Sequence, residues 1–204
     1  TKRFSAEAAV RPFINKFPKE TLACVTRWSE SNEYHVRRLA SEGTRPNLPW
    51  AKKINYDHQL FLPILDTLHA DKTRYVTRSV ANHLNDVSKF APSEVMNLLE
   101  KWRSESKQSQ SELSFITKHS LRTLVKDGDD RALKILGYSK VRATALLRLA
   151  KTKIKVGDEL EFDLEVEVAE TKSSDLLIHY IIYFKKSDGR LSPKVFLLKK
   201  TRVN

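Results

Sequence analysis

The chain has 204 residues, and its 37 Lys and Arg against 25 Asp and Glu give a formal charge of +12. Its hydrophobic fraction of 40% is too high for an intrinsically disordered chain, and its 5 Gly and 7 Pro are too few for a fibre or a linker-rich protein. No apolar run approaches the roughly 20 residues that span a bilayer, the N-terminal stretch is charged throughout, and the single Cys24 excludes an intrachain disulfide and a multi-cysteine zinc site.

From Ser5 to about Gly137 the apolar residues recur at helical spacing, which predicts a helical domain over residues 1–150. We expect helices at 5–16 and 129–137, with three two-helix units between them at about 17–50, 57–90 and 92–127. The second helices of these units align at an offset of 40 residues, through segments 35–38, 75–78 and 115–118. A period of ~40 residues with two helices per unit is typical of HEAT-like repeats, which stack into an α-solenoid.

Beyond about Lys151 the hydrophobic period changes from that of a helix to that of a strand. Apolar and acidic residues alternate over 160–168, and two more strands are predicted at 176–184 and 194–199, joined by a turn at 187–190. An immunoglobulin-like sandwich has ~7 strands and ~100 residues. We therefore expect residues 151–204 to form a partial all-β immunoglobulin-like domain, and the chain to be an excerpt of a longer protein.

Positive charge is concentrated in the helical part, where residues 1–150 hold 26 Lys and Arg against 16 Asp and Glu. A field of this sign attracts nucleic acid. The 40-residue register predicts three columns across the second helices: first Arg38, Arg78 and Lys118; then Glu42, Asn82 and Arg122; then Asp86 and Lys126. A basic surface that only maintains solubility would show no such registration, so the columns predict a groove that follows a phosphate backbone.

Two carboxylates interrupt the predicted basic groove. Asp86 lies in the last turn of its helix and Glu42 lies one residue before Gly43, positions where the helix dipole disfavours an anion by ~0.3 to 1 kcal/mol. Either acid alone is readily explained by ion pairing with a neighbouring arginine. Both together, within a field that attracts phosphate, indicate a cationic ligand or catalytic chemistry.

The segment after Glu42 is a loop stiffened by Pro46 and Pro49, and it carries Arg45 and Trp50. An arginine and a tryptophan in one rigid loop are able to hold a phosphate and to stack on a nucleotide. We therefore expect this loop to contribute to nucleic-acid binding.

Four segments resemble the AlkC-type DNA alkylation repair glycosylases, which are related to the AlkD-type enzymes. They are FSAEAAVRPFI at 4–14, HVRRLASEGTRPNLPW at 35–50, YVTRSVANHLND at 75–86 and ITKHSLRTLVKDG at 116–128. The resemblance implies a monofunctional glycosylase that excises cationic N3-methylated bases, such as 3-methyladenine and 3-methylcytosine, from duplex DNA without fully flipping the lesion into a deep pocket. It also implies a C-terminal immunoglobulin-like domain that contacts DNA.

A methylated base is already a good leaving group, so such an enzyme chiefly has to stabilise positive charge on the sugar. A carboxylate ~4 Å from that charge contributes ~4 kcal/mol at an effective dielectric of ~20, or about three orders of magnitude in rate. The catalytic candidates are Glu42 and Asp86, with Glu7 as a third because it lies in the first family-like segment. The predicted DNA ligands are Arg38, Arg45, Trp50, Arg78, Asn82, Lys118 and Arg122.

The sequence thus predicts a cytoplasmic, monomeric DNA glycosylase of base excision repair, acting on duplex DNA with alkylated bases. We expect no cofactor, no metal and no membrane partner. The alternative is a non-catalytic HEAT-repeat scaffold that binds nucleic acid or an acidic protein through the same groove. The two hypotheses differ in the role that they give to the carboxylates.

Overall fold

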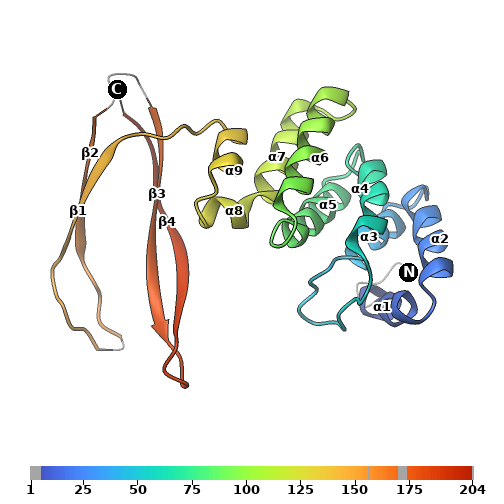
Figure 1. Ribbon diagram of the computed structural model, residues 1–204, viewed down its shortest axis with the longest axis horizontal. Helices are drawn as coiled ribbons and strands as arrows, with labels where there is room; N and C mark the ends of the chain where they lie inside the picture. The colour runs from blue at the N-terminus through green and yellow to red at the C-terminus, as the bar shows by residue number, and fades with distance from the viewer. Residues whose placement is uncertain (1–5, 156, 170–173, 204) are drawn as a thin grey trace. The chain divides into compact units, whose positions relative to one another are not determined.

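The computed structural model describes residues 6–155, 157–169 and 174–203 (Figure 1). The chain forms two compact units, Thr1–Ala132 and Leu133–Asn204, which are described separately below. Among the described residues, no helix combines the length and the apolar character that crossing a membrane requires.

The first unit is helical, as predicted, and its elements occur in the expected places. The helices are α1 (Ala6–Lys16), α2 (Pro18–Ser29), α3 (Tyr34–Glu42), the short 3-10 helix η1 (His58–Phe61), α4 (Leu62–Leu68), α5 (Arg74–Val87), α6 (Pro92–Glu105), α7 (Gln110–Ser120), α8 (Arg122–Lys126) and α9 (Asp130–Ile135). Helix α1 precedes the first helix pair, and each of the three predicted two-helix repeats contains a first and a second helix.

Local sequence signals account for several of these boundaries. Prolines begin α2 and α6, where the missing N–H has no helical partner to lose. The Ser109 side chain accepts a hydrogen bond from the Glu112 backbone N–H at the start of α7, and Asp57 caps η1 in the same manner. The helical period predicts where the helices lie, and these residues fix where several of them begin.

The helices pack in two rows, with α3, α5 and α7 side by side and the first helices of the pairs in the other row (Figure 1). The central helix α5 directs one apolar face into the core, because its side chains recur at three- and four-residue spacing. That face is fully buried and consists of Val76, Val80, Leu84 and Val87. The stacking of helix pairs is the arrangement that the HEAT-like repeat predicts.

The second unit contains two antiparallel hairpins (Figure 1). Strand β1 (Ala143–Leu149) pairs with β2 (Phe162–Val168), and β3 (Ser174–Lys185) pairs with β4 (Leu191–Val203). The predicted turn at 187–190 joins β3 to β4, with Gly189 at a φ of 83° that favours glycine. The expected change from helices to strands is confirmed.

Strand β1 is absent from the sequence-based prediction, which extends the helical domain to residue 150. Its sequence, ATALLRL, carries leucines at both odd and even positions, so the alternation that marks a half-buried strand is not visible. The predicted domain boundary therefore lies after the first strand of the β unit rather than before it.

Candidate active site on the helical unit

The three predicted catalytic carboxylates come from three different helices and meet in one buried cluster. Glu7 is contributed by α1, Glu42 by the end of α3 and Asp86 by the end of α5, and they are 1%, 3% and 3% exposed. Arg38 and Arg45 join them. We call these five residues the acidic cluster.

Two arginines bridge the carboxylates in sequence. Arg38 donates from Nη1 to Glu7 Oε1, and its Nη2 lies 3.7 Å from Glu42 Oε2. Arg45 donates from Nη1 to Glu42 Oε1 at 2.5 Å and from Nε to Asp86 Oδ2 at 2.9 Å. The three acids are thus held in a fixed order along one network of charge-assisted hydrogen bonds.

The repeat and one glycine explain why these residues meet. Arg45 and Asp86 are 41 residues apart, close to one repeat, so adjacent second helices bring them together. Gly43 ends α3 at the point where α1 crosses it, and a Cβ there would lie 2.6 Å from the Val10 side chain. The absence of a side chain at this position lets α1 approach and place Glu7 beside Arg38.

The three carboxylates differ in how fully they are hydrogen-bonded. Ser79 donates to Glu42 Oε2 at 2.7 Å, and Lys89 donates to Asp86 Oδ1 at 3.3 Å, so both acids have partners on both oxygens. Glu7 Oε2 is buried with no hydrogen-bond partner among the described residues. Burial raises the pKa of Glu7, against the opposing effect of Arg38. Glu7 is the least compensated acid of the cluster.

The predicted cation column divides into two kinds of residue. Arg78 and Lys118 are exposed, and the structure shows no partner for either among the described residues. Arg38 instead turns into the acidic cluster, where its guanidinium lies 4.7 Å from the centre of the Tyr75 ring. Arg45 is also buried, at 8% exposure. Arg38 and Arg45, which the sequence predicts as DNA ligands, are therefore engaged with carboxylates and are not exposed cations like Arg78 and Lys118.

The predicted polar ligands Asn82 and Arg122 contact each other, with Asn82 on α5 one turn before Asp86 and Arg122 at the start of α8. Arg122 donates from Nη2 to Asn82 Oδ1 at 3.1 Å, and His119 Nε2 lies 2.9 Å from the same oxygen. Burial, followed by the charges of Arg122 and Arg78, lowers the pKa of His119 to about 4. The neutral imidazole of His119 donates a hydrogen bond to Asn82 Oδ1, which therefore accepts hydrogen bonds from both His119 and Arg122.

Trp50 lies on the loop between α3 and η1, residues 43–57, which we call the α3–η1 loop. Its side chain is 61% exposed, which is unusual for a tryptophan and leaves it accessible to a ligand. The prolines Pro46 and Pro49 stand on either side of Asn47 and Leu48, of which Leu48 is buried. The predicted ligand loop thus presents its aromatic residue to solvent.

Four contributing residues escaped the sequence analysis: Ser79, Lys89, Tyr75 and Arg11. Ser79 and Lys89 contact the carboxylates, and Tyr75 contacts Arg38. Arg11 follows Glu7 by four residues, a spacing that places two side chains on one face of a helix. That spacing is the sequence signal that places Arg11 on the same helix face as Glu7.

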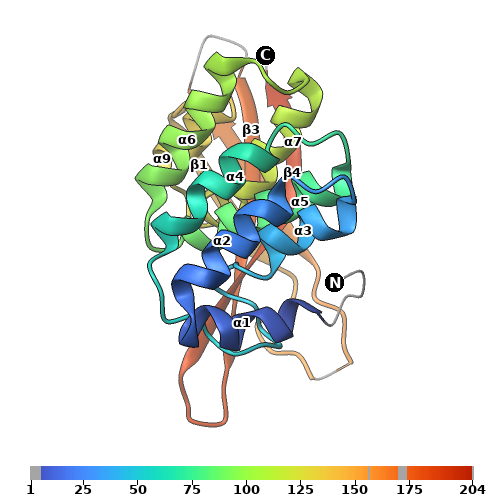
Figure 2. The ribbon, with the colours of Figure 1, turned by 90° about the vertical axis from the view of Figure 1, so that its right-hand side faces the viewer.

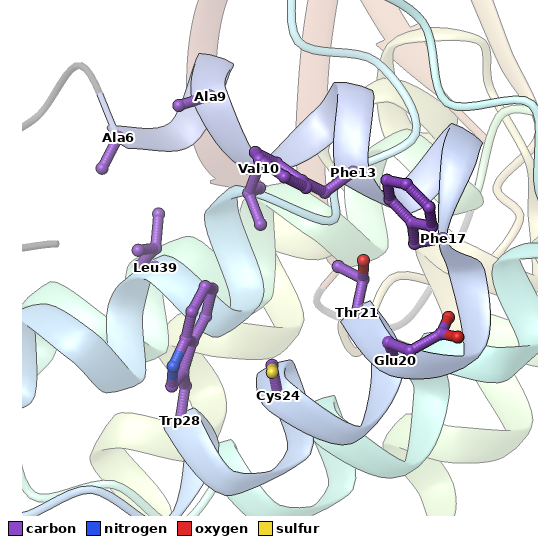
Figure 3. A pocket seen from close by; sticks show the side chains of 10 residues that line it. All are labelled: Ala6, Ala9, Val10, Phe13, Phe17, Glu20, Thr21, Cys24, Trp28 and Leu39. Carbon is purple, nitrogen blue, oxygen red and sulfur yellow. The ribbon is translucent and has the colours of Figure 1, made fainter.

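An apolar groove of about 550 Å³ lies between α1, α2 and α3 (Figure 3). Phe13, Trp28 and Leu39 line it, with Cys24 and Glu20. None of the predicted phosphate ligands lines this groove, and its apolar walls offer nothing that recognises an anion. The acidic cluster, and not this groove, is therefore the candidate active site.

Comparisons with known proteins show the family to which the chain belongs. Residues 4–123 match the family described as DNA alkylation repair enzyme, and residues 143–204 match the C-terminal Ig-like domain of the uncharacterised protein YhaZ. The chain is 37% identical to the uncharacterized protein YhaZ of Bacillus subtilis (strain 168), over 100% of this chain and 57% of that protein.

A solved structure supports the same family assignment. The alkylpurine DNA glycosylase AlkC of Pseudomonas fluorescens, bound to DNA that contains an abasic site analog, is 37% identical and superimposes with a TM-score of 0.87. The match covers 97% of this chain and 55% of that chain. The chain thus spans about half the length of both relatives, and the resemblance stated from the sequence is confirmed.

Proposed function

Because the chain belongs to the DNA alkylation repair enzyme family, we propose that it is a monofunctional DNA glycosylase. It hydrolyses the N-glycosidic bond of cationic N3-alkylated bases, such as 3-methyladenine and 3-methylcytosine, in duplex DNA. The observation that supports this proposal is the acidic cluster, in which three carboxylates are buried together and paired with Arg38 and Arg45.

The chemistry requires little beyond charge stabilisation and a water molecule. When the bond between the sugar C1′ and the base nitrogen breaks, its electron pair leaves with the base, which loses its positive charge. The sugar becomes an oxocarbenium-like cation, and water adds to C1′ and gives up a proton. A carboxylate ~6 Å from the sugar attracts a unit positive charge by ~3 kcal/mol at an effective dielectric of ~20, so direct contact is not needed.

The hydrogen bonds of the cluster suggest how the three acids divide this work. Glu42 and Asp86 are held by donors on both oxygens, so they act as fixed negative charges. Glu7 Oε2 is free of partners among the described residues, and the pKa of Glu7 is raised by burial. Glu7 is therefore the acid best suited to accept the proton of the attacking water.

Duplex DNA is held by the exposed members of the columns and by the α3–η1 loop. Arg78 and Lys118 contact phosphates, with Asn82 and Arg122 next to them. Trp50 packs against the damaged nucleotide, and its exposed ring provides the surface for this contact. Arg38 and Arg45 act from within the acidic cluster, where they set the positions of the carboxylates.

A glycosylase assay tests the proposal directly. Purified protein is incubated with duplex DNA methylated by an alkylating agent, and release of 3-methyladenine is followed by chromatography while DNA binding is measured on the same samples. Release of the base from methylated DNA, and none from unmethylated DNA, is the expected result. Binding without release would refute catalysis and favour the non-catalytic scaffold.

A further inference from the structure

The side chain of Arg11 is fully buried, and its guanidinium donates hydrogen bonds to main-chain carbonyl oxygens of the α3–η1 loop. Nη1 donates to the carbonyl oxygens of Gly43 at 3.3 Å and Arg45 at 2.7 Å, and Nη2 donates to that of Pro46 at 3.5 Å. Nε donates to the carbonyl oxygen of Lys52. One side chain thus ties the beginning of the loop to its end.

Asn15, one turn further along α1, extends the same attachment. Its amide donates to the carbonyl oxygen of Lys53 at 2.9 Å, and its own oxygen accepts the backbone N–H of Asn55 at 2.9 Å. Both views show the loop after α3 lying beside α1 (Figures 1 and 2). The segment between the attached ends contains Trp50.

A buried guanidinium without a hydrogen-bonded carboxylate is costly, so the position of Arg11 calls for an explanation. The structure shows no carboxylate hydrogen-bonded to Arg11 among the described residues, although Glu7 lies on the same helix face four residues earlier. The planar fork of five N–H donors suits several carbonyl oxygens at once, which a lysine ammonium on a flexible stem does not match. The cost of burial is offset only if the loop takes this one shape.

We propose that Arg11, assisted by Asn15, is a positioning residue that holds the α3–η1 loop in its DNA-binding shape. By fixing the loop it presents Trp50 to the nucleotide, and by holding the backbone of Arg45 it sets the guanidinium that joins Glu42 to Asp86. This inference rests on the proposed function for its consequence, but the attachment itself is testable without any DNA.

Limited proteolysis tests the attachment. Trypsin cuts after Lys52 and Lys53, and the rate of cleavage at these two bonds, followed by mass spectrometry, reports how often the loop opens. We expect Arg11→Met and Arg11→Lys each to raise that rate about tenfold, because cleavage follows the population of the open loop. Arg27→Met, the same change at an exposed arginine on α2, is the matched control and should leave the rate unchanged.

Two outcomes would overturn the attachment. One is an unchanged rate in Arg11→Met, and the other is full protection in Arg11→Lys, which would mean that charge alone is enough. If Arg11→Met does not fold by circular dichroism, Asn15→Ala replaces it, because Asn15 is exposed and its side-chain hydrogen bonds within the described residues all go to the end of the loop. Unchanged cleavage in that variant would also contradict the inference.

A double-mutant cycle tests whether Arg11 acts through Trp50. The affinity for duplex DNA is measured for wild type, Arg11→Met, Trp50→Ala and the double variant. We expect each single change to weaken binding about tenfold and the double variant to be little weaker than either, since coupled residues are non-additive. Additive losses would show that Arg11 does not position Trp50. If wild type binds DNA but releases no methylated base, the proposed function fails, while the proteolysis and the cycle still decide the role of Arg11.

Discussion

Both oxygens of Asp86 are occupied, one by Arg45 and the other by Lys89. An aspartate in this state is more often structural than catalytic, and the same holds for Glu42. Asp86 and Glu42 differ from ordinary buried ion pairs because Glu7 lies in the same cluster, and one oxygen of Glu7 has no hydrogen-bond partner among the described residues. The role of each acid is therefore a question for substitutions that alter charge and little else.

We predict that Asp86→Asn lowers base excision about a hundredfold while DNA affinity is kept, because the amide removes the charge that stabilises the sugar cation. The measurement is the single-turnover rate of base release at saturating protein. Asp71→Asn is the matched control, since Asp71 pairs with Arg37 and its side chain is 3% exposed, as is that of Asp86.

Both substitutions break a buried ion pair, which costs about 3 to 5 kcal/mol of stability, so rates are compared at a temperature at which both variants are folded. Equal loss of excision in the two variants would mean that Asp86 only supports the fold. Unchanged excision in Asp86→Asn would move the catalytic role to Glu42 or Glu7.

The proposed DNA-binding surface is formed by the second helices of several repeats rather than by a single residue. α5 and α7 each expose one cation at the same repeat position, Arg78 and Lys118, while α3 turns the corresponding Arg38 inward. The helix next to the loop thus directs its cation into the acidic cluster, while the following helices leave theirs exposed to solvent. Under the proposed function, these exposed cations bind the phosphate backbone beside the acidic cluster.

We predict that Arg78→Gln and Lys118→Gln each weaken DNA binding and reduce the slope of log affinity against log salt by about 0.9, the value for one lost phosphate contact on duplex DNA. Binding is measured by titration at several salt concentrations. Lys19→Gln, at an exposed lysine on α2, is the control and should leave the slope unchanged. If the slope of log affinity against log salt is unchanged in both Arg78→Gln and Lys118→Gln, these residues do not contact phosphates.

In the helical unit, stability depends on polar groups that are buried between repeats. His83 is fully buried between α3 and α5, where its Nδ1–H donates to the Ser41 carbonyl oxygen, and Nε2 has no partner among the described residues. Burial is the main reason that its pKa is lowered from 6.5 to about 4. The folded unit therefore contains a histidine that resists protonation.

We predict that the free energy of unfolding falls as the pH is lowered from about 6.5 to about 4. In this range the unfolded chain binds a proton at His83 and the folded chain does not, so the unfolded state binds more protons and acid favours it. The full effect is about 3 kcal/mol, and it is absent above pH 6.5. Urea denaturation of wild type and His83→Gln at several pH values measures it, and an equal dependence on pH in the two proteins would refute it.

The sequence by itself determined the helix positions, the 40-residue repeat and the change from helices to strands, because helical period, repeat offset and strand alternation are local properties. It also selected the three carboxylates that meet in the acidic cluster. Strand β1 escaped because leucines at both parities hide its alternation. Only the tertiary structure decided which side chains of the columns meet. It shows that Arg38 and Arg45, which the sequence predicts as DNA ligands, pair with Glu7, Glu42 and Asp86, and that Arg11 binds the main chain of a loop more than thirty residues away. The physical reason is that a helix position fixes only the direction of a side chain, while its partner depends on how closely neighbouring helices approach, as Gly43 allows at α1.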